Sequence, residues 1–595
     1  MGRKASNAIR IDRIPKTKPN GDRYVYERHS KYNAEKGYYV SVKTKLLGKM
    51  KPGSDDKYDL IPTRPKRPKA SAKKHEADVM VSKRFHFGVL SIVRHIEAVS
   101  GVSTALSASI IDDPGLLQKT RTLAWYDFCS DGKAWTGVRN WSVRYHGLIP
   151  YSETPFSKDM YHDVFMKLES DNSIQQRFFA ERAKYLLDGE LVALDSSTIV
   201  IESDNVKYGR STKHKDGRIV PCFKLIVLYS VSSHKPIAFR IVPGPISDSA
   251  TVPNAISQLK AILPNDRTVE LVSDNGYATE ADLYAYYSEG QKFITRVEAD
   301  RTWISKLIDD CRDELEHGGE PIDCDEKFSG KAFLDVRKKI VRRKNQMEKG
   351  ATIEKNINVF IYYSSVNKAK DDTFFRKKYA AVKKDLLKGH ALGEDKDEIE
   401  KFAQKYMNIT YNANGSVKTV SVNREAYEKH MKYNGFLVII ASHERDLNQA
   451  LVKFRKREYI EEGIKNIKGH TGGKCARVWS NDALEGEMFC WFVSLCMHEA
   501  FETKINYMKE TLNILNGNED HDKASNMKLE RKLLKWVSDY SCHEILDWFD
   551  VVDYTTVSGN GEEQKWRAEF TERDALFLKQ LGIDIEDFKP NQTEG

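Results

Sequence analysis

The sequence predicts a multidomain α/β protein. It would have a mixed-sheet core interrupted by a large insertion, helical flanking domains and a small N-terminal β domain. With 595 residues, the chain is too long to fold around one hydrophobic core. Between residues 186 and 300, short apolar runs typical of strands alternate with helical patterns, and another strand pattern returns near residue 435. The first 74 residues also differ in charge from everything that follows.

Positive charge is concentrated at the N-terminus. The whole chain has a net charge of +9, whereas residues 1–74 contain 21 Lys and Arg against 7 Asp and Glu. These residues therefore carry +14, and the rest of the chain carries −5. After a disordered start over residues 1–20, we expect three short strands, at residues 24–26, 38–42 and 58–61. Residues 1–75 are predicted to be a basic arm with a small DNA-binding β domain, although a basic tail can also serve solubility alone.

Helical regions flank and interrupt the predicted core. Residues 76–185 are predicted to form a helical DNA-binding domain, which starts with an apolar stripe from Val81 to Val99 at the helical period. Aromatic and basic residues follow this stripe, and a helical core with basic edges explains them equally well. Residues 301–434 are predicted to be an insertion domain, and residues 505–595 a C-terminal helical domain.

Two aspartates stand out on strands of the predicted core. Asp195 follows four apolar residues in a strand buried on both faces, where a carboxylate is unfavourable unless a cation compensates its charge. Asp274 ends a later strand at an Asp-Asn-Gly turn, so turn chemistry alone also explains it. From residue 190 to 297 the order is strand, strand, strand, helix, strand, helix, strand, which is that of a ribonuclease-H-like fold. Residues 186–300 and 435–504 are therefore predicted to be two parts of one catalytic core.

A third acid lies on a predicted helix over residues 454–468. At about 100° per residue, Arg457, Glu461 and Lys468 fall on one stripe beside an apolar face of isoleucines. An acid between two cations suits a metal-binding carboxylate flanked by phosphate contacts. A surface salt-bridge face is the alternative, because Arg457 and Glu461 also form an i, i+4 pair.

The spacing in this helix, aromatic-x2-Arg-x3-Glu-x6-Lys, resembles the Y-x2-R-x3-E-x6-K signature of DDE-type bacterial insertion-sequence transposases. Phe454 stands where that family usually has Tyr, which is a mild departure. The resemblance implies a ribonuclease-H-like catalytic domain with two aspartates on strands and a glutamate on a later helix. The implied catalytic and metal-binding residues are Asp195, Asp274 and Glu461. The implied DNA-binding residues are Arg457, Lys465 and Lys468.

These residues predict phosphoryl transfer with metal ions. Three carboxylates provide the oxygen ligands that suit two Mg²⁺ ions, with Mn²⁺ as a substitute. The predicted function is a transposase that binds the ends of its mobile element, cleaves the DNA and joins the ends to target DNA. Its partners would be double-stranded DNA, at the element ends and at the target, and a second copy of the chain in a DNA-bound homodimer.

Two alternatives to a transposase stay open. One is a non-mobile metal-dependent nuclease on the same fold, and the other is a catalytically inactive DNA-binding protein. Terminal inverted repeats beside the coding region would distinguish a transposase from both.

Other classes of protein are disfavoured by composition. No apolar run reaches the length of a membrane span and the N-terminus lacks a signal-peptide core, so we expect a cytoplasmic protein associated with the bacterial nucleoid. The eight cysteines include no CxxC pair, which argues against a disulfide framework or a zinc ribbon.

Overall fold

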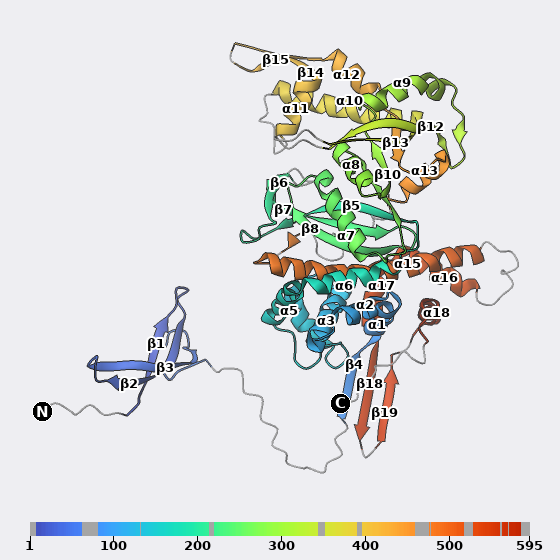
Figure 1. The fold of residues 1–595 in the computed structure, drawn as a ribbon. Coiled ribbons are helices and arrows are strands. Elements are labelled where there is room, and N and C mark those ends of the chain that lie inside the picture. Colours follow the sequence, from blue (N-terminus) through green and yellow to red (C-terminus); the bar gives the residue numbers. More distant parts are fainter. Residues whose placement is uncertain are drawn as a thin grey trace. The chain divides into compact units, whose positions relative to one another are not determined.

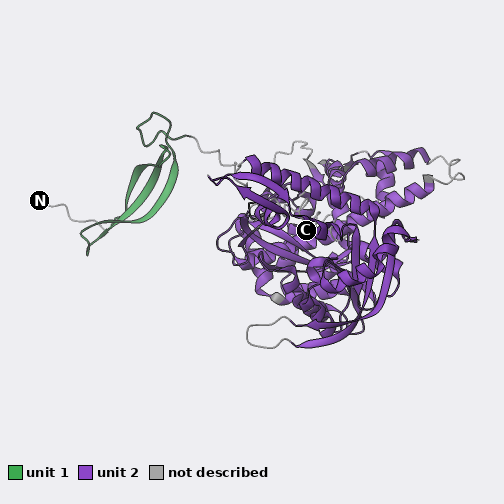
Figure 2. Ribbon diagram, turned by 90° about the horizontal axis from the view of Figure 1, so that it is seen from above, with its two compact units in different colours: residues 1–80 green, residues 81–595 purple. Residues whose placement is uncertain are grey.

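The computed structural model divides the chain into two compact units, residues 1–80 and residues 81–595 (Figure 2). The structure describes residues 8–61, 81–130, 132–213, 219–342, 351–388, 396–413, 415–458, 475–476, 478–516, 527–559, 562–568 and 570–584. In this part of the chain, no single helix is both long and apolar enough to span a bilayer. Helices α1 (Gly88–Val99) and α2 (Val102–Ser109), which are bent by 69° relative to each other, together have the length and composition of a span.

The first unit holds a three-stranded antiparallel sheet in the order β1-β2-β3 (Figure 1). Its strands are β1 (Arg10–Thr17), β2 (Arg23–Asn33) and β3 (Tyr38–Lys49). The second and third strands confirm two of the three expected strands. The expectation of disorder over residues 1–20 is wrong for β1, whose backbone pairs along its whole length with β2. The strand expected at residues 58–61 is reduced to one bridge, between Met50 and Leu60.

The second unit is built on a mixed sheet whose central strands run in the order β8-β7-β5-β9-β10. The strands are β5 (Glu190–Ile201), β7 (Ile219–Ser230), β8 (Lys235–Pro243), β9 (Val269–Ser273) and β10 (Lys292–Val297). The first three are antiparallel neighbours, and β9 lies parallel to both β5 and β10. This is the ribonuclease-H-like arrangement, so the predicted fold class is confirmed.

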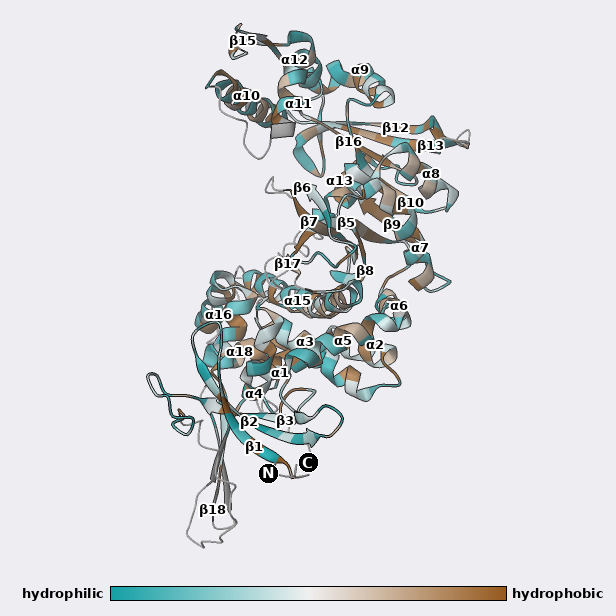
Figure 3. Cartoon of the chain, turned by 90° about the vertical axis from the view of Figure 1, so that its left-hand side faces the viewer, coloured by the Kyte–Doolittle hydropathy of each residue, from teal (hydrophilic) through white to brown (hydrophobic). Residues whose placement is uncertain are grey.

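The apolar runs of the sequence form the inside of this sheet. All five residues of β9 are buried, as are the first five of β5, and these strands are among the most hydrophobic in Figure 3. Helix α7 (Val252–Ile262) buries one apolar face. Helix α8 (Glu280–Ser288) begins with a capping box between Thr279 and Asp282. Both helices lie at the positions that the sequence predicts.

Part of the predicted insertion continues the sheet. Strand β16 (Phe436–Ala441) pairs with β10 on one side and with β13 (Thr352–Tyr363) on the other. Strands β12 (Asp325–Val341) and β11 (Pro321–Ile322) follow β13, which gives an 11-stranded sheet within the described residues. This first part is therefore not separate from the core, because its strands share the core's hydrogen-bond ladder.

The rest of the insertion has a small apolar core of its own, made of Val382, Ala403, Met407 and Val420. It is formed by α10 (Ser365–Lys388), α11 (Lys396–Tyr406), α12 (Arg424–Met431), β14 (Met407–Tyr411) and β15 (Val417–Val422). Helix α9 (Thr302–His317) packs against β12 and β13, and its Asp309 pairs with Lys432 of this part at 2.8 Å.

The flanking regions are mostly helical but also form a second small sheet. Strand β4 (Val81–His86) pairs with β18 (Asp553–Gly559), which pairs with β19 (Glu562–Arg567). The helix expected to start at Val81 therefore starts at Gly88, and the C-terminal region is not helical throughout. The helices of both flanks are α1, α2, α3 (Pro114–Ser130), α4 (Val138–Arg144), α5 (Lys158–Ser170), α6 (Asn172–Ala183), α16 (Met527–Asp539), α17 (Cys542–Asp550) and α18 (Glu572–Leu581).

One long helix, α15 (Asn481–Asn516), joins the sheet to these helices. It packs against β8 on one side and against α3 and α5 on the other (Figure 1). The sequence predicts an apolar helix over residues 483–501, and α15 contains this segment. The described residues also form short elements, namely β6 (Arg210–Lys213), η1 (Trp135–Gly137), η2 (Asp248–Thr251), η3 (Asn275–Tyr277), α13 (Leu447–Arg455) and β17 (Cys475–Ala476).

Candidate catalytic site

Two of the three predicted acids lie at adjacent positions on neighbouring parallel strands. The register of β5 and β9 pairs Leu194 with Ser273, the last residue of β9. Asp195 and Asp274 each come one residue later, and the backbone of Asp274 is still extended, with φ −85° and ψ 178°. Parallel strands lie about 4.8 Å apart and paired residues point to the same face, so the two carboxylates share one edge and one face of the sheet.

The hydrogen bonds around these aspartates hold their backbones in place. Oδ1 of Asp195 accepts a bond of 2.8 Å from the N–H of Ser196. The hydroxyl of Thr295, on β10, donates to the carbonyl oxygens of Ser273 and Asp274 at 3.1 Å and 3.2 Å. Oδ1 of Asp274 is buried and has no hydrogen-bond partner among the described residues.

These observations fit a divalent cation. A buried carboxylate oxygen without a partner is costly in a protein interior, and a metal ion compensates it. Carboxylate oxygens are also the ligands that Mg²⁺ and Mn²⁺ prefer. The described residues contain no group of three or more His, Cys, Asp or Glu that could hold a metal. The third predicted ligand, Glu461, lies outside the described residues.

The helix that should carry the third acid is described only at its start. The helix predicted over residues 454–468 is interrupted there, because α13 ends at Arg455 and a turn follows. Phe454 is 8% exposed, and the guanidinium of Arg457 lies 5.5 Å from the centre of its ring. The other two predicted DNA contacts, Lys465 and Lys468, lie outside the described residues, as does Glu461.

The structure adds polar residues that the sequence did not single out. Asp248, at the start of η2, accepts hydrogen bonds from the hydroxyl of Ser196 at 2.8 Å and from Nζ of Lys224 at 2.9 Å. Tyr277 is 2% exposed, and burial, followed by the negative charges of Asp248 and Asp195, raises its pKa well above the usual value. Its phenol therefore stays protonated beside these acids. Lys224 gives the one signal available from sequence, a cation inside the apolar run of β7.

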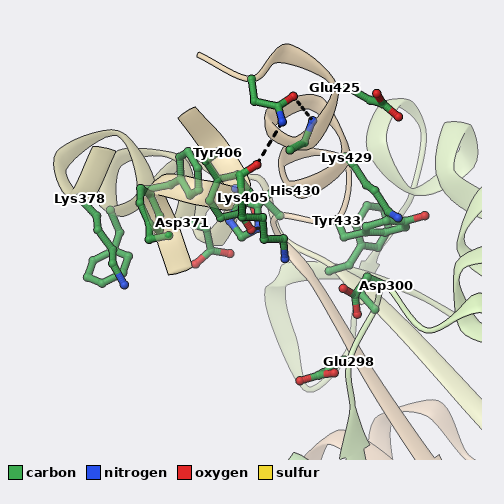
Figure 4. A pocket seen from close by; sticks show the side chains of 18 of the residues that line it. Glu298, Asp300, Asp371, Lys378, Lys405, Tyr406, Glu425, Lys429, His430 and Tyr433 are labelled. Atoms are coloured by element: carbon green, nitrogen blue, oxygen red, sulfur yellow. Dashed lines mark hydrogen bonds between the residues drawn. The ribbon is translucent and has the colours of Figure 1, made fainter. Parts of the chain in front are cut away.

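A pocket of about 850 Å³ lies between the end of β10 and the helices of the insertion (Figure 4). One of its lining residues, Glu298, accepts a bond of 3.4 Å from the side chain of Asn275, which directly follows Asp274. The insertion contributes the aromatic residues Phe375, Phe402 and Tyr406, the lysines Lys378, Lys405 and Lys429, and also His430. Burial, and then the charge of Lys405, lowers the pKa of His430, so its ring is neutral at physiological pH. The lining also contains four carboxylates, which balance its basic side chains: Glu298, Asp300, Asp371 and Glu425.

Residues 187–497 match the family model of the transposase DDE domain, which spans more than half of the chain and includes both strand aspartates. The chain belongs to this family. It is therefore an enzyme of the DDE transposase class, which carries out DNA recombination by transposition. Enzymes of this class generally depend on divalent metal ions and act on DNA.

Two further comparisons add little to this assignment. No curated protein matches the sequence. Among solved structures, the chain is similar to a piggyBac transposase in a synaptic complex with hairpin DNA, at 8% sequence identity and a TM-score of 0.34. The similarity covers 86% of this chain and 87% of that chain. At such a TM-score it supports no conclusion about the fold or the site.

Proposed function

We propose that this transposase binds the ends of its mobile element, cleaves the DNA there and joins the ends to target DNA by two-metal phosphoryl transfer. The proposal rests on the register of β5 and β9, which sets Asp195 beside Asp274. It also rests on a buried carboxylate oxygen of Asp274 that has no hydrogen-bond partner among the described residues. Glu461 is the proposed third ligand. Two Mg²⁺ ions, or Mn²⁺ in their place, are the proposed cofactors.

The protein's own part in the reaction would be to bind the metal ions and to keep their ligands in a fixed geometry. When bound, the metal ions would activate the attacking hydroxyl and stabilise the leaving oxygen. Asp195 and Asp274 would bind the ions from rigid strands, and the Thr295 hydroxyl, which shares its one hydrogen between the carbonyl oxygens of Ser273 and Asp274, would help to fix the Asp274 backbone. Tyr277 stays protonated beside Asp248 and Asp195, so its phenol would add no negative charge near the bound phosphate.

Contacts with DNA are assigned to cations on both units. Arg457, Lys465 and Lys468 would bind phosphates near the metal ions, where Arg can make two parallel hydrogen bonds. The basic sheet of residues 1–75 would bind the element end. Because an element has two ends, we further propose that two copies of the chain act together as a homodimer on DNA.

The metal site is tested by replacing each acid with its amide, in Asp195→Asn, Asp274→Asn and Glu461→Gln. Each change removes a charged ligand with almost no change in shape. The substrate would be DNA fragments from both flanks of the coding region, incubated with Mg²⁺ and with Mn²⁺. We expect the cleavage rate to fall by at least about a thousandfold for each variant, because the three acids would bind the metal ions jointly and the loss of one would disable the whole site.

A matched control separates the site from general effects of charge. Asp266 is exposed in the same domain, between α7 and β9, and Asp266→Asn should cleave normally. Near-normal cleavage by any of the three site variants would remove that residue from the proposed site.

A further inference from the structure

Behind the two strand aspartates lies an ion pair that contacts both of the segments carrying them. Nζ of Lys224, on β7, is 2.9 Å from Oδ1 of Asp248, and their side chains are 17% and 33% exposed. The same oxygen accepts the hydroxyl of Ser196 at 2.8 Å. Ser196 directly follows Asp195, and its N–H is bonded to the Asp195 carboxylate. Two hydrogen bonds therefore connect Asp248 to Asp195.

The strand register explains why this contact forms on the opposite face from the aspartates. In the β5–β7 pair, Ser196 is opposite Ile226 and Thr198 is opposite Lys224. Side chains alternate along a strand, so Ser196 and Lys224 share one face and Asp195 points to the other. Asp248 reaches that first face from the loop after β8, where η2 begins.

Asp248 also contacts the segment of the second aspartate. Gly276 lies two residues after Asp274, and a Cβ on it would be 3.3 Å from Oδ2 of Asp248 and 3.5 Å from its Cβ. The first distance is slightly tighter than an ordinary van der Waals contact and the second is an ordinary one, so a methyl group at Gly276 would press against Asp248 and the turn passes close to this carboxylate. One carboxylate thus accepts a hydrogen bond from Ser196 on β5 and lies at the start of η2, which packs against η3, the turn that follows β9.

We propose that Lys224 and Asp248 form a positioning clamp, which fixes the separation of Asp195 and Asp274 and so sets the affinity of the site for divalent metal ions. The proposal rests on the proposed metal site, and it assigns no contact with substrate to either residue. Lys224 neutralises Asp248, so the clamp adds no net negative charge behind the site. Groups that orient metal ligands commonly change metal affinity by about 10- to 100-fold when they are lost.

The clamp is tested by Mn²⁺ binding to the full-length protein, with free Mn²⁺ measured by electron paramagnetic resonance. Lys224→Met keeps the aliphatic stem and removes the charge, Asp248→Asn keeps the shape and removes the charge, and a third variant combines both. We expect each single variant to weaken Mn²⁺ binding by about tenfold. The double variant should lose no more than either single one, because the two residues act as one unit. Ser196→Ala, which removes only the hydroxyl bond, should weaken binding by a smaller factor and keeps the test available if the charge variants fold poorly.

Lys338→Met is the matched control. Lys338, on β12 of the same sheet, pairs with Glu280 of α8 at 2.7 Å, and its side chain is also 17% exposed. It should lose a similar amount of thermal stability and bind Mn²⁺ normally. Wild-type Mn²⁺ affinity in Lys224→Met, Asp248→Asn and Ser196→Ala, or additive losses in the double variant, would overturn the clamp.

The two proposals fail in different ways. If Asp195→Asn and Asp274→Asn bind Mn²⁺ as the wild type does, the metal site itself is wrong, and the clamp is overturned with it. If these two variants lose Mn²⁺ binding while the Lys224, Asp248 and Ser196 variants retain it, the metal site stands and only the clamp is overturned.

Discussion

A buried carboxyl on α15 makes the stability of this transposase depend on pH. Glu487 is 3% exposed, and its Oε1 accepts a bond of 2.8 Å from the indole N–H of Trp135. The other oxygen of Glu487 has no hydrogen-bond partner among the described residues. Burial raises the pKa of Glu487 to about 8, although the bond from Trp135 opposes the rise. The side chain is therefore mostly a neutral acid at pH 7.

Glu487→Gln should stabilise the protein progressively more as the pH rises. An unfolded glutamate loses its proton near pH 4.5, whereas folded Glu487 keeps it until about pH 8. Across this window folding takes up a proton, so wild-type stability falls with rising pH, by up to roughly 1.4 kcal/mol per pH unit from this group. Glutamine does not titrate and keeps an oxygen for Trp135. Denaturant midpoints measured across the window should diverge between variant and wild type.

An exposed glutamate provides the comparison for this prediction. Glu153 is exposed, so Glu153→Gln should show a difference from wild type that hardly changes with pH. A pH-independent difference for Glu487→Gln as well would contradict the neutral, buried carboxyl.

The energetic cost of burying a charge also explains how much of the site could be predicted from the sequence. Asp195 is recognisable because a carboxylate inside an apolar strand needs compensation. Its place beside Asp274 follows once the strand order is known. Asp248 could not be found, because its contacts with Ser196 and Lys224 depend on the path of the loop after β8. The positions of Glu461 and the two lysines after it stay predictions.

At the scale of elements, the close approach of two helices depends on one glycine. Gly486, near the start of α15, faces the backbone of Phe165 on α5. A Cβ on Gly486 would lie 2.1 Å from the carbonyl oxygen and 2.5 Å from Cα of Phe165. Backbone atoms cannot move aside as a side chain does, so any larger residue must push the helices apart.

Gly486→Ala should therefore destabilise the protein by about 3 kcal/mol, at the upper end of ordinary overpacking costs. Gly115, in the first turn of α3, is the matched glycine, because a Cβ there would meet only Oδ1 of Asp113 at 3.4 Å. Gly115→Ala should be neutral or stabilise by up to about 1 kcal/mol, since alanine favours helices. Thermal midpoints of the two variants give the comparison. Equal effects would show that helix propensity, and not the contact with α5, governs Gly486.

Elements with a local pattern were predictable, and elements made by distant pairing were not. Strands β7, β8, β9 and β10 and helices α7 and α8 carry their period in their own residues. By contrast, β4 pairs with β18, more than 460 residues later in the chain, and β12 and β13 join the core sheet only through β16. The short segment of β4 continues the apolar period of α1, so its residues suggested helix until the partner strand decided otherwise.

At the scale of the whole molecule, charge distinguishes the two units. Residues 1–80 contain 21 Lys and Arg against 9 Asp and Glu and so carry +12, whereas residues 81–595 carry −3. Within residues 8–61 the buried residues are Val25, Ser30, Gly48 and Met50, so the sheet has a very small core. Tyr38, Tyr39 and Tyr58 are among its exposed side chains, and Lys16 and Lys18 lie against the rings of Tyr26 and Tyr24. Because so few of its residues are buried, the sheet exposes basic and aromatic side chains of the kind that bind nucleic acids.

Deleting residues 1–74 should therefore weaken DNA binding and flatten its dependence on salt. Each phosphate neutralised contributes about −0.9 to the slope of log affinity against log salt concentration. The remaining chain is net acidic, so most of that slope should come from the deleted residues. The strands β1 to β3 also predict that the sheet recognises the element end, since charge alone requires no folded surface. Affinities for end DNA and random DNA, measured over a salt series with and without these residues, give both the salt slope and the preference for end DNA. A truncated protein that keeps its slope and its preference would place recognition in the helical flank or the insertion.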